Sequence, residues 1–118
     1  MKNLNISLFV VATILLSQFA FAGAPMKTPD LVAKGEKSYK TNCSICHGDK
    51  GDGNGPAGGS LVPKARNFVS EKYKFGNKPE QVFKTITNGT KNTSMTGFGH
   101  LPEEERWALA FYVLSFKK

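Results

Sequence analysis

Cysteine and histidine meet at one point of this 118-residue chain, where Cys43, Cys46 and His47 form the pattern C-x-x-C-H. A disulfide between these two cysteines would close a very short loop and contribute little through chain entropy. A redox-active dithiol of this spacing belongs beside a βαβ pattern, and no strand-rich segment precedes Cys43. A structural zinc site needs four ligands, and His100 is the one other histidine in the sequence.

The interpretation that fits the pattern better is covalent attachment of a c-type haem. On a helix, residues three apart lie on one face, so both sulfurs can reach the two vinyl groups of the same haem. His47 follows directly and can turn its imidazole to the iron from the same side. We therefore expect one haem c, bonded to Cys43 and Cys46, with His47 as a ligand of its iron.

A second axial ligand must come from elsewhere in the chain, and Met95 and His100 are the candidates. Met95 lies in a polar segment rich in small residues, which is typical of a loop that reaches across a haem, whereas a methionine that fills a core belongs in an apolar periodic segment. We expect Met95, with His100 or an open position as alternatives. A thioether and an imidazole raise the reduction potential and fill both axial positions, which argues against an enzyme.

These motifs, in their order and spacing, resemble the small monohaem class I cytochromes c of the bacterial periplasm, over residues 28–118. In that family a methionine in a comparable loop before the last helix is the distal ligand, a role that Met95 resembles. A proline carbonyl orients the proximal histidine there, which implies Pro63 here, with Pro56 as the alternative. The matching stretches are residues 35–39, 43–47, 61–63, 66–68, 93–95 and 105–112.

The sequence predicts that helices position these residues. Thr28 and Pro29 are typical of an N-cap and first position, so a first helix is expected from there. A second is expected over 79–88, ended by Gly89, and a third from Pro102 onward with Lys117 and Lys118 at its end. No strand-length run of period two occurs after residue 22, so the fold class is all-α.

The resemblance to the cytochrome c fold implies more about how these elements meet. The first and last helices of that family cross at a glycine and an aromatic ring, which Gly35 and Tyr112 resemble, although each could also be buried independently. The remaining helix and the loops would then wrap one covalently bound haem. The glycine-rich residues 48–60 lack the closing residues of a P-loop or an EF-hand, so we expect a surface loop that wraps the haem edge.

The first 22 residues read as a signal peptide that is cleaved on export. An apolar run from Ile6 to Leu16 ends at the small-x-small pattern Ala20-Phe21-Ala22. The alternative is an uncleaved anchor, but Ile6 to Ala22 is at the short limit of about 17–25 residues for a membrane span and contains polar residues. We expect a mature cytochrome c domain of residues 23–118 in the periplasm, without a stable membrane anchor.

The formal charge of the chain is +7, and it becomes +6 when Lys2 leaves with the signal peptide. The basic residues of the second half form either an ordinary solvated surface or a positive face that steers an acidic redox partner. Export and the lack of a basic run argue against nucleic acid. The sequence therefore predicts a monomeric, periplasmic one-electron carrier or, alternatively, the cytochrome subunit of an oxidoreductase complex. The residues in question are Lys64, Arg66, Lys72, Lys74, Lys78, Lys84 and Lys91.

Overall fold

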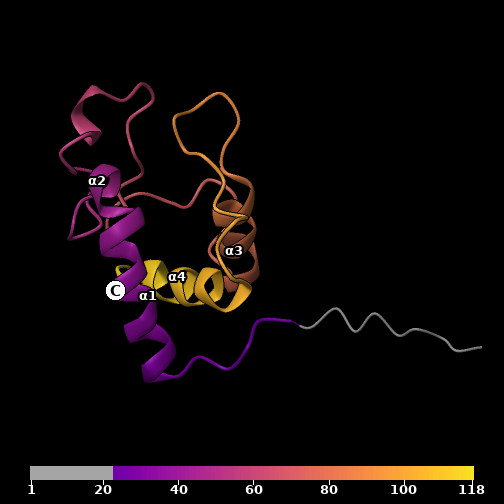
Figure 1. Ribbon diagram of the computed structural model, residues 1–118. Helices are drawn as coiled ribbons and strands as arrows, with labels where there is room; N and C mark the ends of the chain where they lie inside the picture. Colours follow the sequence, from indigo (N-terminus) through magenta and orange to yellow (C-terminus); the bar gives the residue numbers. More distant parts are fainter. Residues whose placement is uncertain (1–22) are drawn as a thin grey trace, which may run out of the picture.

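The computed structural model describes residues 23–118, which form helices and connecting loops (Figure 1). Residues 23–118 contain no strand, and the predicted all-α class is confirmed. The predicted signal peptide, residues 1–22, lies outside the described residues. Within residues 23–118, none of the helices has the length and apolar character that a membrane span requires.

Helix α1 comprises Pro29–Asn42 and begins as its sequence predicts. The Thr28 hydroxyl accepts a hydrogen bond from the Leu31 N–H at 3.2 Å, and Pro29 occupies the first turn, where its missing N–H is no loss. The last helical residue is Asn42, and Cys43 caps the helix with its N–H, which donates to the Tyr39 carbonyl at 2.9 Å. A single further turn, α2 (Ser44–His47), follows at once. The C-x-x-C-H pattern therefore lies immediately beyond a long, well-capped helix.

Helix α4 comprises Glu103–Ser115, and α1 crosses it (Figure 1). A Cβ atom at Gly35 would overlap the Ala108 carbonyl and lie 2.9 Å from the Cβ of Tyr112. Only glycine lets the two backbones approach this closely. The predicted crossing of the first and last helices at Gly35 and Tyr112 is confirmed.

Helix α3 (Pro79–Asn88) has the predicted bounds and packs on the other side of α4. The Phe83 ring stacks on Trp107 with centroids 4.0 Å apart, and this contact joins the two helices. Because α1 and α3 both cover α4, that helix is buried on more than one face, as its apolar sequence predicts. The three helices share one buried core, to which Phe68 also belongs. Its residues are Tyr39, Phe68, Val82, Ile86, Leu109, Ala110 and Val113.

The C-terminal end of α4 differs from the prediction. We expected Lys117 and Lys118 at the end of the helix, but the last helical residue is Ser115. Phe116 instead turns its ring toward Tyr39, with centroids 5.3 Å apart, and the Lys117 ammonium donates to the Glu71 carbonyl at 2.7 Å. Packing of Phe116 and the bond to Glu71 therefore replace the expected interaction of the lysines with the helix dipole.

Candidate haem site

A cavity of about 370 Å³ brings the predicted site residues together. Its lining includes α2 and the segment 61–76 on one side, and α3 with the loop that follows it on the other, as the arrangement in Figure 1 shows. Cys43, Cys46, His47 and Met95 all line this cavity. His100, the alternative axial ligand, is exposed and lies outside the lining.

Cys43 and Cys46 are half-buried and are not joined to each other by a disulfide. Burial and, to a lesser extent, the neighbouring Cys46 raise the pKa of the Cys43 thiol to about 12. Redox-active dithiols work as thiolates and have lowered pKa values. The raised pKa of the Cys43 thiol is therefore the opposite of what a redox-active dithiol has.

His47 is 9% exposed, and its Nδ1 lies 3.0 Å from the main-chain carbonyl oxygen of Arg66. A carbonyl can only accept, so Nδ1 carries the proton and donates it, which leaves the lone pair of Nε2 free. Burial lowers the pKa of His47 below its usual range, although the bond to Arg66 opposes this effect. The ring is thus held as the neutral tautomer that an iron ligand requires.

The acceptor for His47 was predicted wrongly. We expected the carbonyl of Pro63 or Pro56, but the acceptor is Arg66. Pro63 lines the cavity without receiving this bond. The chain continues past Pro63 and is fastened by a bond of 2.7 Å from the Phe68 N–H to the Gly51 carbonyl, and this brings the Arg66 carbonyl to the imidazole.

The glycine-rich loop, residues 48–60, packs against α2. The N–H of Gly53 donates to the His47 carbonyl at 2.8 Å, and that of Ala57 donates to the Ile45 carbonyl at 2.9 Å. The cavity lining contains none of residues 48–60. The loop therefore holds the backbone of α2 in place, whereas we expected it to wrap the haem edge, and the residues from Leu61 onward line the cavity instead.

Met95 is held by a closed loop that begins where α3 ends. Gly89 ends α3 with a φ of 69°, and a side chain there would collide with the Met95 carbonyl. That carbonyl accepts from the Thr90 N–H at 2.9 Å, while the Met95 N–H donates to the Thr93 hydroxyl at 3.0 Å. These bonds fix the Met95 backbone beside the cavity, to which its thioether offers a neutral sulfur donor.

The cavity opens at a rim with exposed apolar and basic residues. Ile45 and Phe75 line the cavity and are 57% and 51% exposed, and Val62, between two lining residues, is 91% exposed. Lys64 and Lys74 also belong to the lining. The interior is mainly apolar, with two thiols on one helical turn, a neutral imidazole and a thioether. This donor set and this shape fit a haem c.

Comparison with known proteins agrees with this fit. Residues 30–113 match the family described as cytochrome c oxidase, cbb3-type, subunit III. The chain is 31% identical over 96 residues to the cbb3-type cytochrome c oxidase subunit FixP of Bradyrhizobium diazoefficiens. The alignment covers 81% of this chain and 31% of that protein. It spans less than a third of the length of the curated relatives it matches.

Two solved structures carry the same fold. One belongs to a reducing HAO-like protein complex of Kuenenia stuttgartiensis, with a TM-score of 0.72 and 31% identity, and covers 81% of this chain and 46% of that one. The other is cytochrome c6 from the diatom Phaeodactylum tricornutum, with a TM-score of 0.56 and 25% identity. That match covers 71% of this chain and 91% of the cytochrome. These similarities imply electron transfer by a haem c and its iron. The chain therefore belongs to the cytochrome c family described as cbb3-type oxidase subunit III, and its fold is that of a small c-type cytochrome.

Proposed function

We propose that this protein is a one-electron carrier and not an enzyme. The observation that carries the proposal is the convergence of Cys43, Cys46, His47 and Met95 on one mainly apolar cavity. Haem iron held there would exchange single electrons between Fe(II) and Fe(III) without making or breaking bonds. The mainly apolar lining would limit the access of water to the iron and with it the solvent reorganisation that opposes electron transfer.

Each of the four residues has a distinct role in this proposal. Cys43 and Cys46 would hold one haem covalently through thioethers. His47 and Met95 would be the two axial ligands, and the sulfur of Met95 would raise the reduction potential relative to a second imidazole. With His47 and Met95 both bound to it, the iron would have no position open to a substrate.

Expression of the full chain with the haem-attachment machinery tests this proposal. We expect a coloured protein whose reduced spectrum is that of a c-type haem, and whose haem stays with the chain after denaturation. Replacing both Cys43 and Cys46 by alanine should abolish the covalent bond, whereas Ser44→Ala, within the same turn, should leave it intact. A colourless wild-type protein with free thiols or a disulfide would overturn the proposal.

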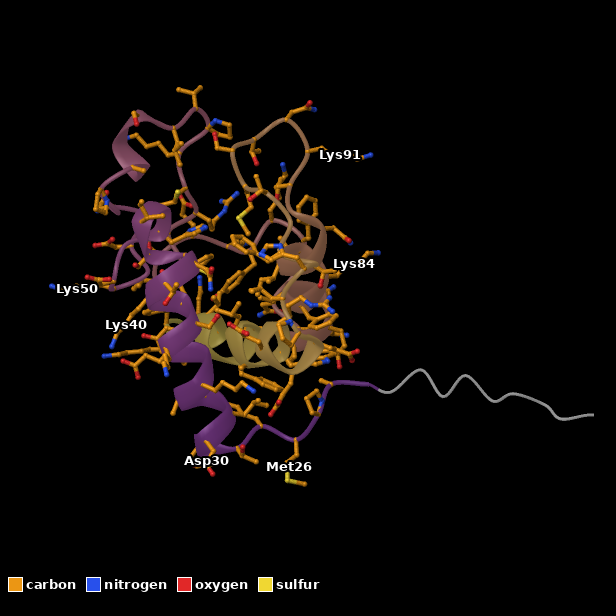
Figure 2. All side chains as sticks on the ribbon, viewed as in Figure 1. Met26, Asp30, Lys40, Lys50, Lys84 and Lys91 are labelled. Atoms are coloured by element: carbon orange, nitrogen blue, oxygen red, sulfur yellow. The ribbon has the colours of Figure 1, made fainter. Side chains whose placement is uncertain are left out.

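We also propose that electrons leave through the rim of the cavity, toward an acidic partner protein. Within residues 23–118, Arg66 is the only basic residue of the segment 64–91 in an ion pair, whereas Lys34 and Lys40 of α1 are both paired. Figure 2 shows Lys84 and Lys91 pointing away from the molecule. Lys64 and Lys74 line the cavity, and the Lys74 ammonium lies 5.2 Å from the centre of the exposed Phe75 ring. Basic and apolar residues together at the rim suit a transient interface with a negative surface.

The second candidate function is that of a cytochrome subunit in an oxidoreductase complex. The similarity to an oxidase subunit and to a chain of a HAO-like complex favours it. Co-purification with a larger enzyme at fixed stoichiometry would support this alternative. Salt-sensitive reduction by several acidic proteins, with the protein itself remaining monomeric, would support a diffusing carrier.

Export completes the proposal and rests on residues 1–22 alone. Cleavage after Ala22 would release a mature protein that begins at Gly23 in the periplasm. N-terminal sequencing of the protein from a periplasmic extract should therefore start at Gly23. A start at Met1, in a membrane fraction, would instead indicate the uncleaved anchor.

A further inference from the structure

We propose that the segment Arg66–Phe68 clamps His47, with Phe68 and Glu71 as the positioning residues. This inference rests on the proposed role of His47 as an iron ligand. The segment contacts the imidazole twice, once in the plane of the ring and once on its face. Together these contacts would fix both the tautomer and the orientation of the ring, which α2 alone does not do.

The first contact is the hydrogen bond from His47 Nδ1 to the Arg66 carbonyl, at 3.0 Å. It fixes the proton on Nδ1 and makes the imidazole a stronger electron donor through its other nitrogen. A stronger donor stabilises Fe(III), so this bond opposes the rise in potential that the thioether of Met95 brings.

The second contact is a stack of the Phe68 ring on the His47 ring, with centroids 4.4 Å apart and planes inclined by 21°. Phe68 is 9% exposed and is itself held on its other sides. Its ring stacks on Tyr73 at 5.7 Å and on Phe116 at 6.3 Å, and its N–H donates to the Gly51 carbonyl. Because these neighbours hold Phe68 in place, its ring restricts rotation of the imidazole about its bond to Cβ.

Glu71 holds the segment from the outside. One of its carboxylate oxygens accepts from the Arg66 guanidinium at 3.2 Å and from the Asn67 N–H at 3.1 Å. Its own carbonyl accepts from Lys117, which ties the segment to the C-terminal end of the chain. Such an exposed ion pair adds little stability, so we assign Glu71 a positioning role.

The test compares Phe68→Leu with Phe111→Leu in the oxidised haem-loaded protein. Phe111 is also buried, but it packs against Leu31 and Ala108 and lies outside the cavity lining. In the oxidised protein we measure the paramagnetically shifted NMR signals of the haem methyl groups, which depend on the orientation of the axial imidazole. In the reduced protein we measure the exchange rate of the His47 Nδ1 proton. The third readout is the reduction potential. Phe68→Leu should rearrange the methyl signals, speed proton exchange by about tenfold and raise the potential.

Phe111→Leu should lower stability to a similar degree and leave all three readouts at wild-type values. Glu71→Gln, which removes one exposed charge, should shift the same readouts in the same direction by less, and it decides the matter if Phe68→Leu yields no folded haem protein. If Phe68→Leu keeps the wild-type values of these readouts, the clamp is overturned and the electron-carrier proposal stays intact. If Phe68→Leu does not fold with haem, wild-type values in Glu71→Gln have the same meaning. A wild-type chain that takes up no haem would instead overturn the proposed function.

Discussion

The helical scaffold and the cavity wall of this molecule are stabilised in different ways. The scaffold, α1, α3 and α4, packs its side chains directly against one another, down to backbone contact at Gly35. The cavity wall, residues 43–47, 61–76 and 89–98, is held mainly by hydrogen bonds between loops, and its apolar side chains line the cavity. The scaffold helices mostly cover one another and turn only a few residues, such as Val82 and Ile86 of α3, to the cavity, whereas the wall has much of its apolar surface there.

The largest effect that the comparison predicts is at the helix crossing of the scaffold. Gly35→Ala introduces a methyl group where the Ala108 carbonyl already lies, so α1 and α4 must separate. We expect a loss of about 2–3 kcal/mol in the free energy of unfolding, measured by urea denaturation. Gly59→Ala is the matched control, because a Cβ there meets nothing within 4 Å. Equal denaturation midpoints for the two variants would contradict the crossing.

A smaller effect is expected at Tyr39, which joins the two regions. Its buried hydroxyl donates to the Gly48 carbonyl, directly after α2, at 2.7 Å. Tyr39→Phe removes this buried bond and leaves the Gly48 carbonyl with the Gly51 N–H, at 3.1 Å, as its remaining donor. The variant should therefore lose about 1 kcal/mol in the free energy of unfolding at pH 7. Urea denaturation at pH 7 measures this loss, and a variant as stable as the wild type would show that the hydroxyl does not connect the regions.

The same tyrosine gives the wild type an alkaline dependence. Burial raises the pKa of Tyr39 well above its ordinary value of 10.0, so the folded state binds this proton more tightly than the unfolded state. The contribution of Tyr39 is therefore complete below pH 10 and is lost as the pH rises further. Between pH 10 and 11, Tyr39→Phe should lose less stability than the wild type, as urea denaturation at both pH values would measure. A steeper loss in the variant would contradict this.

The smallest effect concerns the rim of the cavity wall. Lys74→Glu reverses a charge in the lining, so oxidation of the reduced protein by ferricyanide should slow by roughly two- to tenfold at low salt. Oxidation by a cationic cobalt complex should accelerate. Lys50→Glu, which makes the same change on the glycine-rich loop outside the lining, should have a weaker effect in stopped-flow measurements. Equal changes in the two variants would mean that the rim has no special part in electron exchange.

The scaffold was predictable because its signals are local. Thr28 and Pro29 at the start of α1, and Gly89 at the end of α3, mark helix ends through side-chain or backbone chemistry within one turn. The end of α4 was not predictable, because Phe116 leaves the helix and packs against the rings of Tyr39 in α1 and Phe68 in the segment 61–76. That packing joins residues far apart in the sequence.

The site was predictable where side-chain type carries the chemistry, as in Cys43, Cys46 and Met95. The acceptor for His47 was not, because a main-chain carbonyl is the same in every residue and only the path of the chain selects Arg66. Phe68 was visible as part of a family-like stretch, but its stacking on His47 depends on the fold of the segment that carries it. The position of the glycine-rich loop against α2 was missed for the same reason.

The most direct test of the account is the spectrum of the haem protein with each candidate axial ligand removed. The oxidised wild type should show the weak near-infrared band of sulfur–iron ligation, and its reduced form should not bind carbon monoxide near neutral pH. Met95→Ala should lose the band and gain carbon monoxide binding, while His100→Ala should behave as the wild type. Retention of the band in Met95→Ala, or carbon monoxide binding by the reduced wild type, would contradict an iron closed on both sides by His47 and Met95.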